Sequence, residues 1–223
     1  MRRKTATVRT SRKTRVLVYF APVASESSDL CHLLRQRAAL ATRNHNRAGF
    51  EYETYEAFVL SYARGYDSAR LDTRERAHVR QILREHRTWW HRGFRYKECF
   101  SNCQELMSFD RTGKLVYVEG YVWAHGDRLP PVHHGWLSLH GKVIDLTVVT
   151  RAIAHPRKLP PEPPQLHGEF EGRDYFGVPF LRSHFRERRR LNLVHGSLLD
   201  DEDCGYPLLR YGGEEAVRGR KRA

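Results

Sequence analysis

Three residues that can cooperate in thiol chemistry are Cys99, His134 and Asp145. A cysteine becomes a strong nucleophile when its surroundings favour the thiolate, an imidazole lies beside it, and a further group orients that imidazole. Cys99 lies at the start of a predicted helix, where unpaired N–H groups and the helix dipole favour an anion and can stabilise a developing oxyanion. We therefore expect Cys99 to be the nucleophile, His134 the base and Asp145 the orienting residue.

A β-hairpin is predicted to bring the imidazole and the carboxylate together. We place a two-residue turn at His140-Gly141, because glycine suits the positive φ that such a turn needs. Strand side chains alternate between faces, so His134 and Asp145 point to one side of neighbouring antiparallel strands as diagonal neighbours. His133 points to the opposite face, and His134 is therefore the preferred base. The turn pairs Leu139 with Lys142, Ser138 with Val143, and Trp136 with Asp145.

The motifs at these positions resemble the transglutaminase-like branch of the papain-like cysteine enzymes. That branch combines a helix-start Cys with His-Ala-Trp and Asp-Pro-Thr, and this chain has Cys99, His134-Gly-Trp136 and Val143-Ile-Asp145-Leu-Thr147. Gly135 and Leu146 stand where Ala and Pro are usual, and the three polar residues are kept.

The chain more closely resembles uncharacterised bacterial and phage proteins with related motifs over residues 97–180. The shared motifs are Lys97-Glu-Cys99-Phe-Ser-Asn102, Tyr117-Val-Glu119-Gly120-Tyr121 and Tyr175-Phe-Gly177-Val-Pro179-Phe180. The resemblance implies a papain/transglutaminase-like core, in which the helix carrying Cys99 packs on an antiparallel sheet. It also implies acyl transfer at a thiol without a cofactor: hydrolysis of a peptide or amide, deamidation, or transfer to an amine, on a protein or peptide-like substrate.

Other assignments of these residues stay open at the level of sequence. Cys99 could be a small buried hydrophobic residue, and Asp145 could cap a turn. Cys103 lies one helical turn after Cys99 on the same side and is the alternative nucleophile. Cys99, Cys103, His133 and His134 could form a zinc site, but their spacing is not usual for structural zinc, so we expect no metal.

Three further residues are candidates for substrate binding or for support of the site. Asn102 could hold a substrate amide, and Glu119 could support the site or form a salt bridge; a structural role is favoured for both. A charged Glu119 among apolar strand neighbours needs a partner if it is buried. Trp136 is expected to pack in the core and shield the imidazole.

The order of predicted elements indicates an α+β fold. Helices are expected from near Leu30, over Tyr52–Tyr62, from Asp72 to about Trp90, over Cys99–Phe109 and over Phe185–Arg190. Strands are expected over Thr14–Phe20, Leu115–Trp123, His134–Leu139, Lys142–Val149 and Tyr175–Phe180, and residues 156–168 read as a proline-rich loop.

Positive charge is concentrated toward the two ends of the chain. The 223 residues include 39 Lys+Arg and 26 Asp+Glu, which gives a formal charge of +13 and attracts polyanions. We expect basic tails at 1–13 and 213–223 around a single α+β domain at 14–212. The alternative to an enzyme is a basic nucleic-acid-binding protein on the same fold with a non-catalytic site, supported by the charge and by Trp89 and Trp90 between arginines.

Cysteine and apolar patterning indicate a cytoplasmic protein. Four cysteines without a regular framework argue against a disulfide scaffold. No uninterrupted apolar run reaches the ~18 residues that a membrane span needs, so no membrane partner is expected. The apolar stretch after the basic start, Val16 to Val23, reads as a strand rather than as a signal segment.

We predict that the basic tail at 1–13 is poorly ordered and binds polyanions without sequence preference. Its arginines and lysines neutralise phosphates, so the affinity should fall steeply with salt. Deleting residues 1–13 should weaken nucleic-acid binding and flatten its salt dependence, measured by fluorescence anisotropy at several salt concentrations. An unchanged affinity and an unchanged salt slope would exclude this role.

Overall fold

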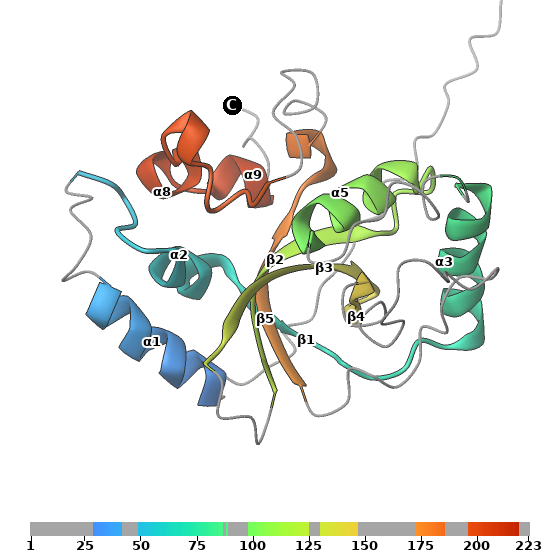
Figure 1. Ribbon diagram of the computed structural model, residues 1–223, viewed down its shortest axis with the longest axis horizontal. Helices are drawn as coiled ribbons and strands as arrows, with labels where there is room; N and C mark the ends of the chain where they lie inside the picture. The colour runs from blue at the N-terminus through green and yellow to red at the C-terminus, as the bar shows by residue number, and fades with distance from the viewer. Residues whose placement is uncertain are drawn as a thin grey trace, which may run out of the picture.

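The computed structural model describes residues 29–41, 49–86, 88, 98–124, 130–146, 173–185 and 196–218. Helices surround one antiparallel five-stranded sheet with the strand order β1-β5-β2-β3-β4 (Figure 1), which confirms the predicted α+β class. The strands are β1 (Arg64–Tyr66), β2 (Val116–Ala124), β3 (Val132–Leu139), β4 (Lys142–Ile144) and β5 (Arg173–Phe180).

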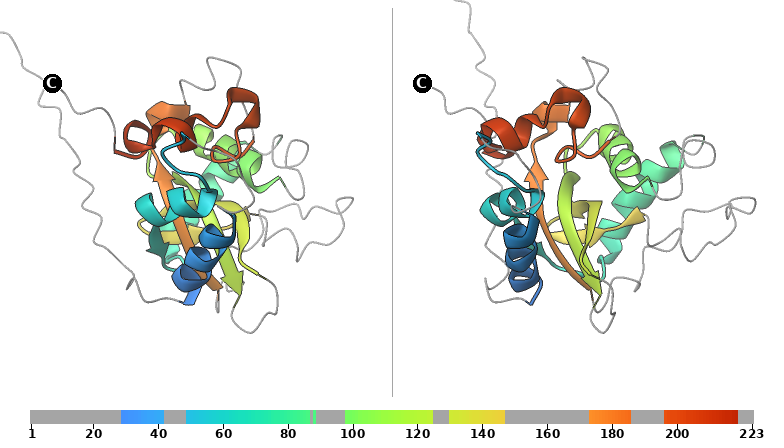
Figure 2. Two further views of the ribbon diagram at one scale, coloured as in Figure 1. Left: turned by 90° about the vertical axis from the view of Figure 1, so that its left-hand side faces the viewer. Right: turned by 60° about the vertical axis from the view of Figure 1, so that its left-hand side comes forward.

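Helices lie on both sides of this sheet. They are α1 (Asp29–Ala41), α2 (Tyr55–Tyr62), α3 (Thr73–Glu85), α5 (Cys99–Phe109), α8 (Pro207–Tyr211) and α9 (Glu214–Arg218), with a 3₁₀ turn η1 (Glu202–Cys204). Figures 1 and 2 show α1 and α2 on one side of the sheet and α3 on the other, with α5 between α3 and the strands. The helices predicted near Leu30 and over Cys99–Phe109 are confirmed.

The third helix begins where the sequence predicts and ends earlier. The Asp72 side chain accepts hydrogen bonds from the backbone N–H groups of Arg74 and Glu75, and the Glu75 side chain accepts one from the backbone N–H of Asp72, which together form a capping box. The backbone leaves the helical conformation at His86, so the predicted end near Trp90 is wrong for α3. Trp90 itself lies outside the described residues.

The β-hairpin has the predicted turn and the predicted pairs next to it, but its second strand is shorter and the predicted pair Trp136–Asp145 is absent. Leu139 pairs with Lys142 and Ser138 with Val143, and both turn residues have positive φ, 53° at His140 and 87° at Gly141. The strand predicted over Lys142–Val149 is wrong at Asp145 and Leu146, because β4 ends at Ile144 and residue 146 is helical. Asp145 is therefore the first residue after β4, and Thr147–Val149 lie outside the described residues.

The chain also contains elements that the sequence pattern did not indicate. Strand β1 has only three residues, Arg-Gly-Tyr, which is too short to show an alternating pattern. The described fold continues past residue 212, where a basic tail was expected: Ala216 of α9 is buried and its carbonyl accepts a hydrogen bond from Leu181 N at 2.8 Å. The predicted elements at 14–20 and 156–168, the tail at 1–13 and residues 186–190 lie outside the described residues.

The sheet curls so that its two end strands meet. Asp67, directly after β1, donates its backbone N–H to Gly141 O at 3.1 Å and accepts a hydrogen bond from Val143 N at 2.9 Å. The residues forming this contact link β1 to β4, which lie at opposite ends of the strand order. The five strands therefore form a curled sheet, or half-barrel, with one concave face.

Trp136 fills the concave face of this half-barrel. Its indole is fully buried and meets the rings of Tyr66 and Tyr175 edge-on, with centroids 5.7 Å and 5.2 Å away. Gly177 on β5 leaves space for the indole, since a Cβ at that position would lie 2.4 Å from Trp136 Cη2. Glycine is needed at this position because the aromatic ring occupies the space of a side chain.

We predict that Gly177→Ala lowers the free energy of unfolding by about 1–3 kcal/mol, the usual cost of overpacking a core. Urea denaturation measures the change. Gly196→Ala is the matched control, because a Cβ there meets nothing within 4 Å among the residues that the structure describes. Equal effects of the two substitutions would show that Trp136 is not packed on Gly177.

Candidate active site

Cys99 is the first residue of α5, as the sequence predicts. The N-cap residue Glu98, itself among the described residues, places no side-chain hydrogen bond on the first turn. Helices begin with N–H groups that have no partner within the helix, so this turn offers donors to an anion beside the Cys99 thiol. Cys99 is 7% exposed, so only a small part of the residue is open to a reagent.

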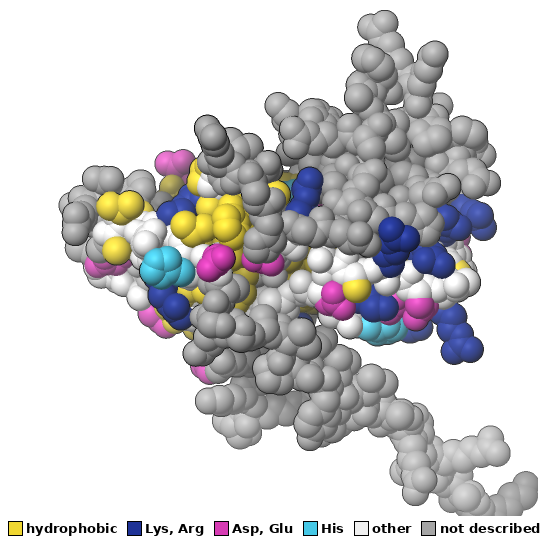
Figure 3. Space-filling view, turned by 90° about the horizontal axis from the view of Figure 1, so that it is seen from below, with side chains coloured by type: hydrophobic (Ala, Val, Ile, Leu, Met, Phe, Trp, Pro, Cys, Tyr) yellow, Lys and Arg dark blue, Asp and Glu magenta, His cyan; other side chains and the backbone are white. Residues whose placement is uncertain are grey.

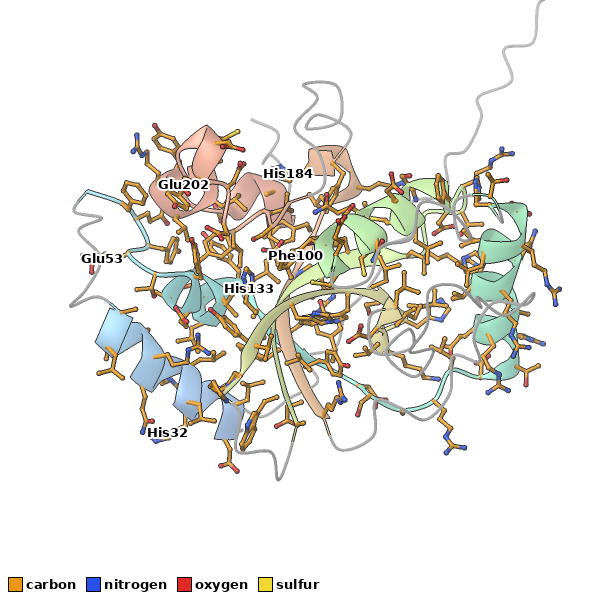
Figure 4. All side chains as sticks on the ribbon, viewed as in Figure 1. His32, Glu53, Phe100, His133, His184 and Glu202 are labelled. Atoms are coloured by element: carbon orange, nitrogen blue, oxygen red, sulfur yellow. The ribbon has the colours of Figure 1, made fainter. Side chains whose placement is uncertain are left out.

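A glycine on β3 lets the start of α5 come close to the sheet. A Cβ at Gly135 would lie 2.8 Å from Phe100 Cδ1 and 3.1 Å from the Tyr117 hydroxyl. One turn later, Cys103 Sγ donates to Gly135 O at 3.5 Å. Figure 4 shows Phe100 near His133, whose ring centroid is 5.1 Å from that of Phe100. The glycine between His134 and Trp136 therefore sets how closely α5, which carries Cys99, approaches β3.

His134 and Asp145 form a direct buried contact. His134 Nε2 lies 2.8 Å from Asp145 Oδ2, and the Asp145 side chain is fully buried. Because Asp145 occupies Nε2, Nδ1 is the ring nitrogen left to face the thiol. Cys99 contributes to the electrostatic environment of the ring, both by charge and by a side-chain hydrogen bond. The structure thus brings together the three residues singled out in the sequence.

The electrostatics of the contact favour a charged imidazole. Burial alone would lower the pKa of His134, but the Asp145 carboxylate and then the Cys99 thiol outweigh it and raise the pKa to about 10. A histidine that is protonated at neutral pH can hold a neighbouring thiolate as an ion pair. The arrangement can therefore activate a thiol before any substrate is bound.

Tyr175 also belongs to the site, although the sequence pattern assigned it no role there. Its hydroxyl donates to Asp145 Oδ2 at 3.0 Å, the same oxygen that contacts His134. Tyr175 lies in a motif noted for its resemblance to other proteins, and that was the available signal. Its role could not be derived, because strand order decides which residues of β5 reach Asp145.

Cys103 differs from Cys99 in exposure and environment. It is fully buried, and burial, followed by the charges of Asp145 and Cys99, raises its pKa well above the ordinary value. A raised thiol pKa disfavours the thiolate, so the structure favours Cys99 over Cys103 as nucleophile. Among the described residues, no group of three or more His, Cys, Asp or Glu side chains is placed to hold a metal ion.

The remaining candidate residues occupy three different environments. Asn102 is 1% exposed on the first turns of α5, and its backbone N–H donates to Glu98 O at 2.9 Å. The Trp136 ring lies nearly parallel to the ring of His134, at 18° and 6.4 Å between centroids, so it covers one side of the imidazole. Glu119 pairs with Gly135 in the sheet, so its side chain points away from His134 to the other face.

On that other face, Glu119 is the centre of a hydrogen-bond cluster. Its carboxylate contacts His133 Nε2 at 3.0 Å and accepts from the Tyr117 hydroxyl at 2.9 Å. It also binds the segment 197–199, through the Ser197 hydroxyl, Leu198 N at 2.8 Å and Leu199 N at 3.1 Å. Burial raises the pKa of Glu119, but His133 and the other donors outweigh it and lower the pKa. Glu119 thus has the partners that a buried charge needs, and it attaches the C-terminal segment to the sheet.

No protein-family model, curated protein or solved structure matches this chain. Within the described part of the chain, no helix is long and apolar enough to cross a membrane. Seen from below, the described surface over α3 carries positive and negative side chains side by side rather than a purely basic face (Figure 3).

We predict that the contribution of the His134–Asp145 contact to stability depends on pH. The ordinary pKa of histidine is about 6.5, and the pKa in the fold is raised to about 10. The contribution is therefore complete below about pH 6.5 and is lost as the pH rises through about 10. The difference in free energy of unfolding between the wild type and Asp145→Asn should shrink over this interval, measured by chemical denaturation at several pH values.

Glu85→Gln removes an exposed carboxylate at the end of α3 and serves as the control. Its effect on stability should be small and should show no such interval. If the effect of Asp145→Asn is the same at all pH values, His134 is not charged in the folded protein.

Proposed function

We propose that the chain is a thiol-dependent acyl-transfer enzyme that uses Cys99, His134 and Asp145. The observation that carries the proposal is the buried contact between His134 Nε2 and Asp145 Oδ2 at 2.8 Å, with the Cys99 thiol beside the same ring. A fully buried carboxylate fixed on a histidine next to a helix-start cysteine is the arrangement that thiol catalysis requires.

In this mechanism the proton of the Cys99 thiol resides on His134 Nδ1, and Asp145 stabilises the resulting imidazolium. The thiolate attacks the carbonyl carbon of an amide, and the first-turn N–H groups of α5 stabilise the oxyanion. His134 then gives its proton to the leaving amine, and a thioester forms on Cys99. Water or a second amine attacks the thioester and transfers its proton to His134. The Cys99 thiolate then leaves, an acid or a new amide is released, and the starting pair of thiolate and imidazolium is restored.

The architecture supports a papain/transglutaminase-like core for this chain. Helix α5, which carries Cys99, packs against β3 of an antiparallel sheet, and β3 carries His134. The third residue follows the next strand of the same hairpin, at Asp145. This is the order of elements that the motif resemblance implies. From that resemblance we propose a protein or peptide-like substrate, hydrolysed, deamidated or transferred to an amine.

We predict that Cys99 is the most reactive of the four thiols. At about pH 6, well below the ordinary thiol pKa of about 8.5, limiting iodoacetamide should modify Cys99 first, because its imidazolium partner favours the thiolate. His134→Ala should slow this reaction at least about tenfold. Peptide mapping by mass spectrometry identifies the modified residue.

His133→Gln is the matched control, because it alters the adjacent histidine, whose ring bonds Glu119 on the other face of the sheet. It should leave the Cys99 rate nearly unchanged. Labelling of Cys103 before Cys99 would show that the wrong nucleophile has been named. Equal rates for His134→Ala and His133→Gln would show that His134 does not activate the thiol.

A further inference from the structure

We infer that Tyr175 is a positioning residue that keeps the Asp145 carboxylate on His134. The inference rests on the proposed function, since the role assigned to Tyr175 is to maintain the histidine that activates Cys99. It adds to that function a fourth residue, from the strand β5, which is separated from β4 by β2 and β3.

Asp145 lies where the sheet no longer holds the backbone. Strand β4 has only three residues, and its last pair with β3 joins Ile144 to Leu137. Asp145 follows this pair directly and has no partner in the β3–β4 ladder. Two side chains from different strands contact its Oδ2 oxygen, His134 of β3 at 2.8 Å and Tyr175 of β5 at 3.0 Å.

Tyr175, by contrast, is held firmly on both sides. It pairs with Val122 of β2 and with Tyr66 of β1 in the sheet, and it is 2% exposed. Its ring meets the Trp136 indole edge-on at 5.2 Å, and that indole in turn lies over His134. Strand β5, which is paired on both sides, thus presents the Tyr175 hydroxyl to the Asp145 carboxylate, which directly follows the short strand β4.

The chemistry of the pair fixes the direction of the hydrogen bond. Burial and then the Asp145 charge raise the pKa of Tyr175, so its hydroxyl keeps its proton and donates to the carboxylate. Two donors that converge on Oδ2 from different elements restrict rotation of the carboxyl group. Loss of the tyrosine hydroxyl removes one of these two donors, so the carboxylate is held less closely against the His134 ring.

This role and a purely electrostatic role have opposite consequences for His134. A hydroxyl that only withdraws negative charge from Asp145 weakens the attraction to the imidazolium, so its loss would raise the pKa of His134 or leave it unchanged. A hydroxyl that positions the carboxylate strengthens the attraction, so its loss lowers that pKa. The sign of the shift therefore decides between the two roles.

The test is Tyr175→Phe, compared with Tyr66→Phe as the matched control. Tyr66 packs on the same Trp136 ring, but its hydroxyl accepts a hydrogen bond from Arg64 Nε at 3.1 Å. The first measurement is the titration of His134 by NMR, which needs no activity. Because a hydrogen bond to a charged group corresponds to about one to two pKa units, Tyr175→Phe should lower the pKa of His134 from about 10 by about that amount. Tyr66→Phe should leave it in place.

The second measurement is the pH profile of Cys99 alkylation, which should shift toward higher pH in Tyr175→Phe alone. Incorporation of a fluorinated tyrosine at 175 keeps the hydroxyl and should restore the wild-type profile. If wild-type Cys99 shows no selective alkylation, the proposed function fails, while the NMR titration still decides the role of Tyr175.

A His134 pKa that rises or does not change in Tyr175→Phe would overturn the inference. Should that variant not fold, the wild-type chain decides by itself. The hydroxyl proton of Tyr175 must exchange slowly with water, because it is buried and bonded to Asp145. Exchange as fast as that of a free phenol would equally overturn the inference.

Discussion

A fully buried carboxylate is costly unless donors surround it, and Asp145 is one of the fully buried carboxylates among the described residues, as Glu119 is. The His134 ring and the Tyr175 hydroxyl both meet its Oδ2 oxygen. These residues come from β3 and β5, so the carboxylate can be matched only when the sheet curls and brings its concave face around Trp136. The charged contact and the curled sheet therefore depend on each other. The Cys99 thiol of α5 lies beside the His134 ring of that contact.

Close approach in this structure depends on small residues beside large ones. Gly177 leaves space for the Trp136 indole, and Gly135 leaves space for Phe100 at the start of α5. Both glycines are at positions where a methyl group would move a part of the site, the ring that covers His134 in one case and the helix that carries Cys99 in the other. The residue between His134 and Trp136 thus has a structural reason to lack a side chain.

Local patterns in the sequence were sufficient to predict the helix that starts at Cys99, the turn at His140-Gly141 and the register of the hairpin, because each depends on residues close together in the chain. Long-range features could not be predicted in this way. The three residues of β1 become a strand only by pairing with β5, and the bond from Tyr175 to Asp145 requires the strand order. The partners of Glu119 include residues 197–199, about eighty positions away, so its need for partners could be foreseen but their identity could not.

The central claim is that Asp145, His134 and Cys99 act as one unit in acyl transfer, and trapping an acyl group tests it most directly. The chain would be treated with an activated ester such as p-nitrophenyl acetate, and the acylated residue would be identified by mass spectrometry with and without hydroxylamine, which cleaves thioesters. The account predicts a hydroxylamine-sensitive acyl group on Cys99 that forms quickly in the wild type and in Cys103→Ala, and slowly in both His134→Ala and Asp145→Asn. Acylation at another residue, or at the same rate in all four proteins, would contradict it.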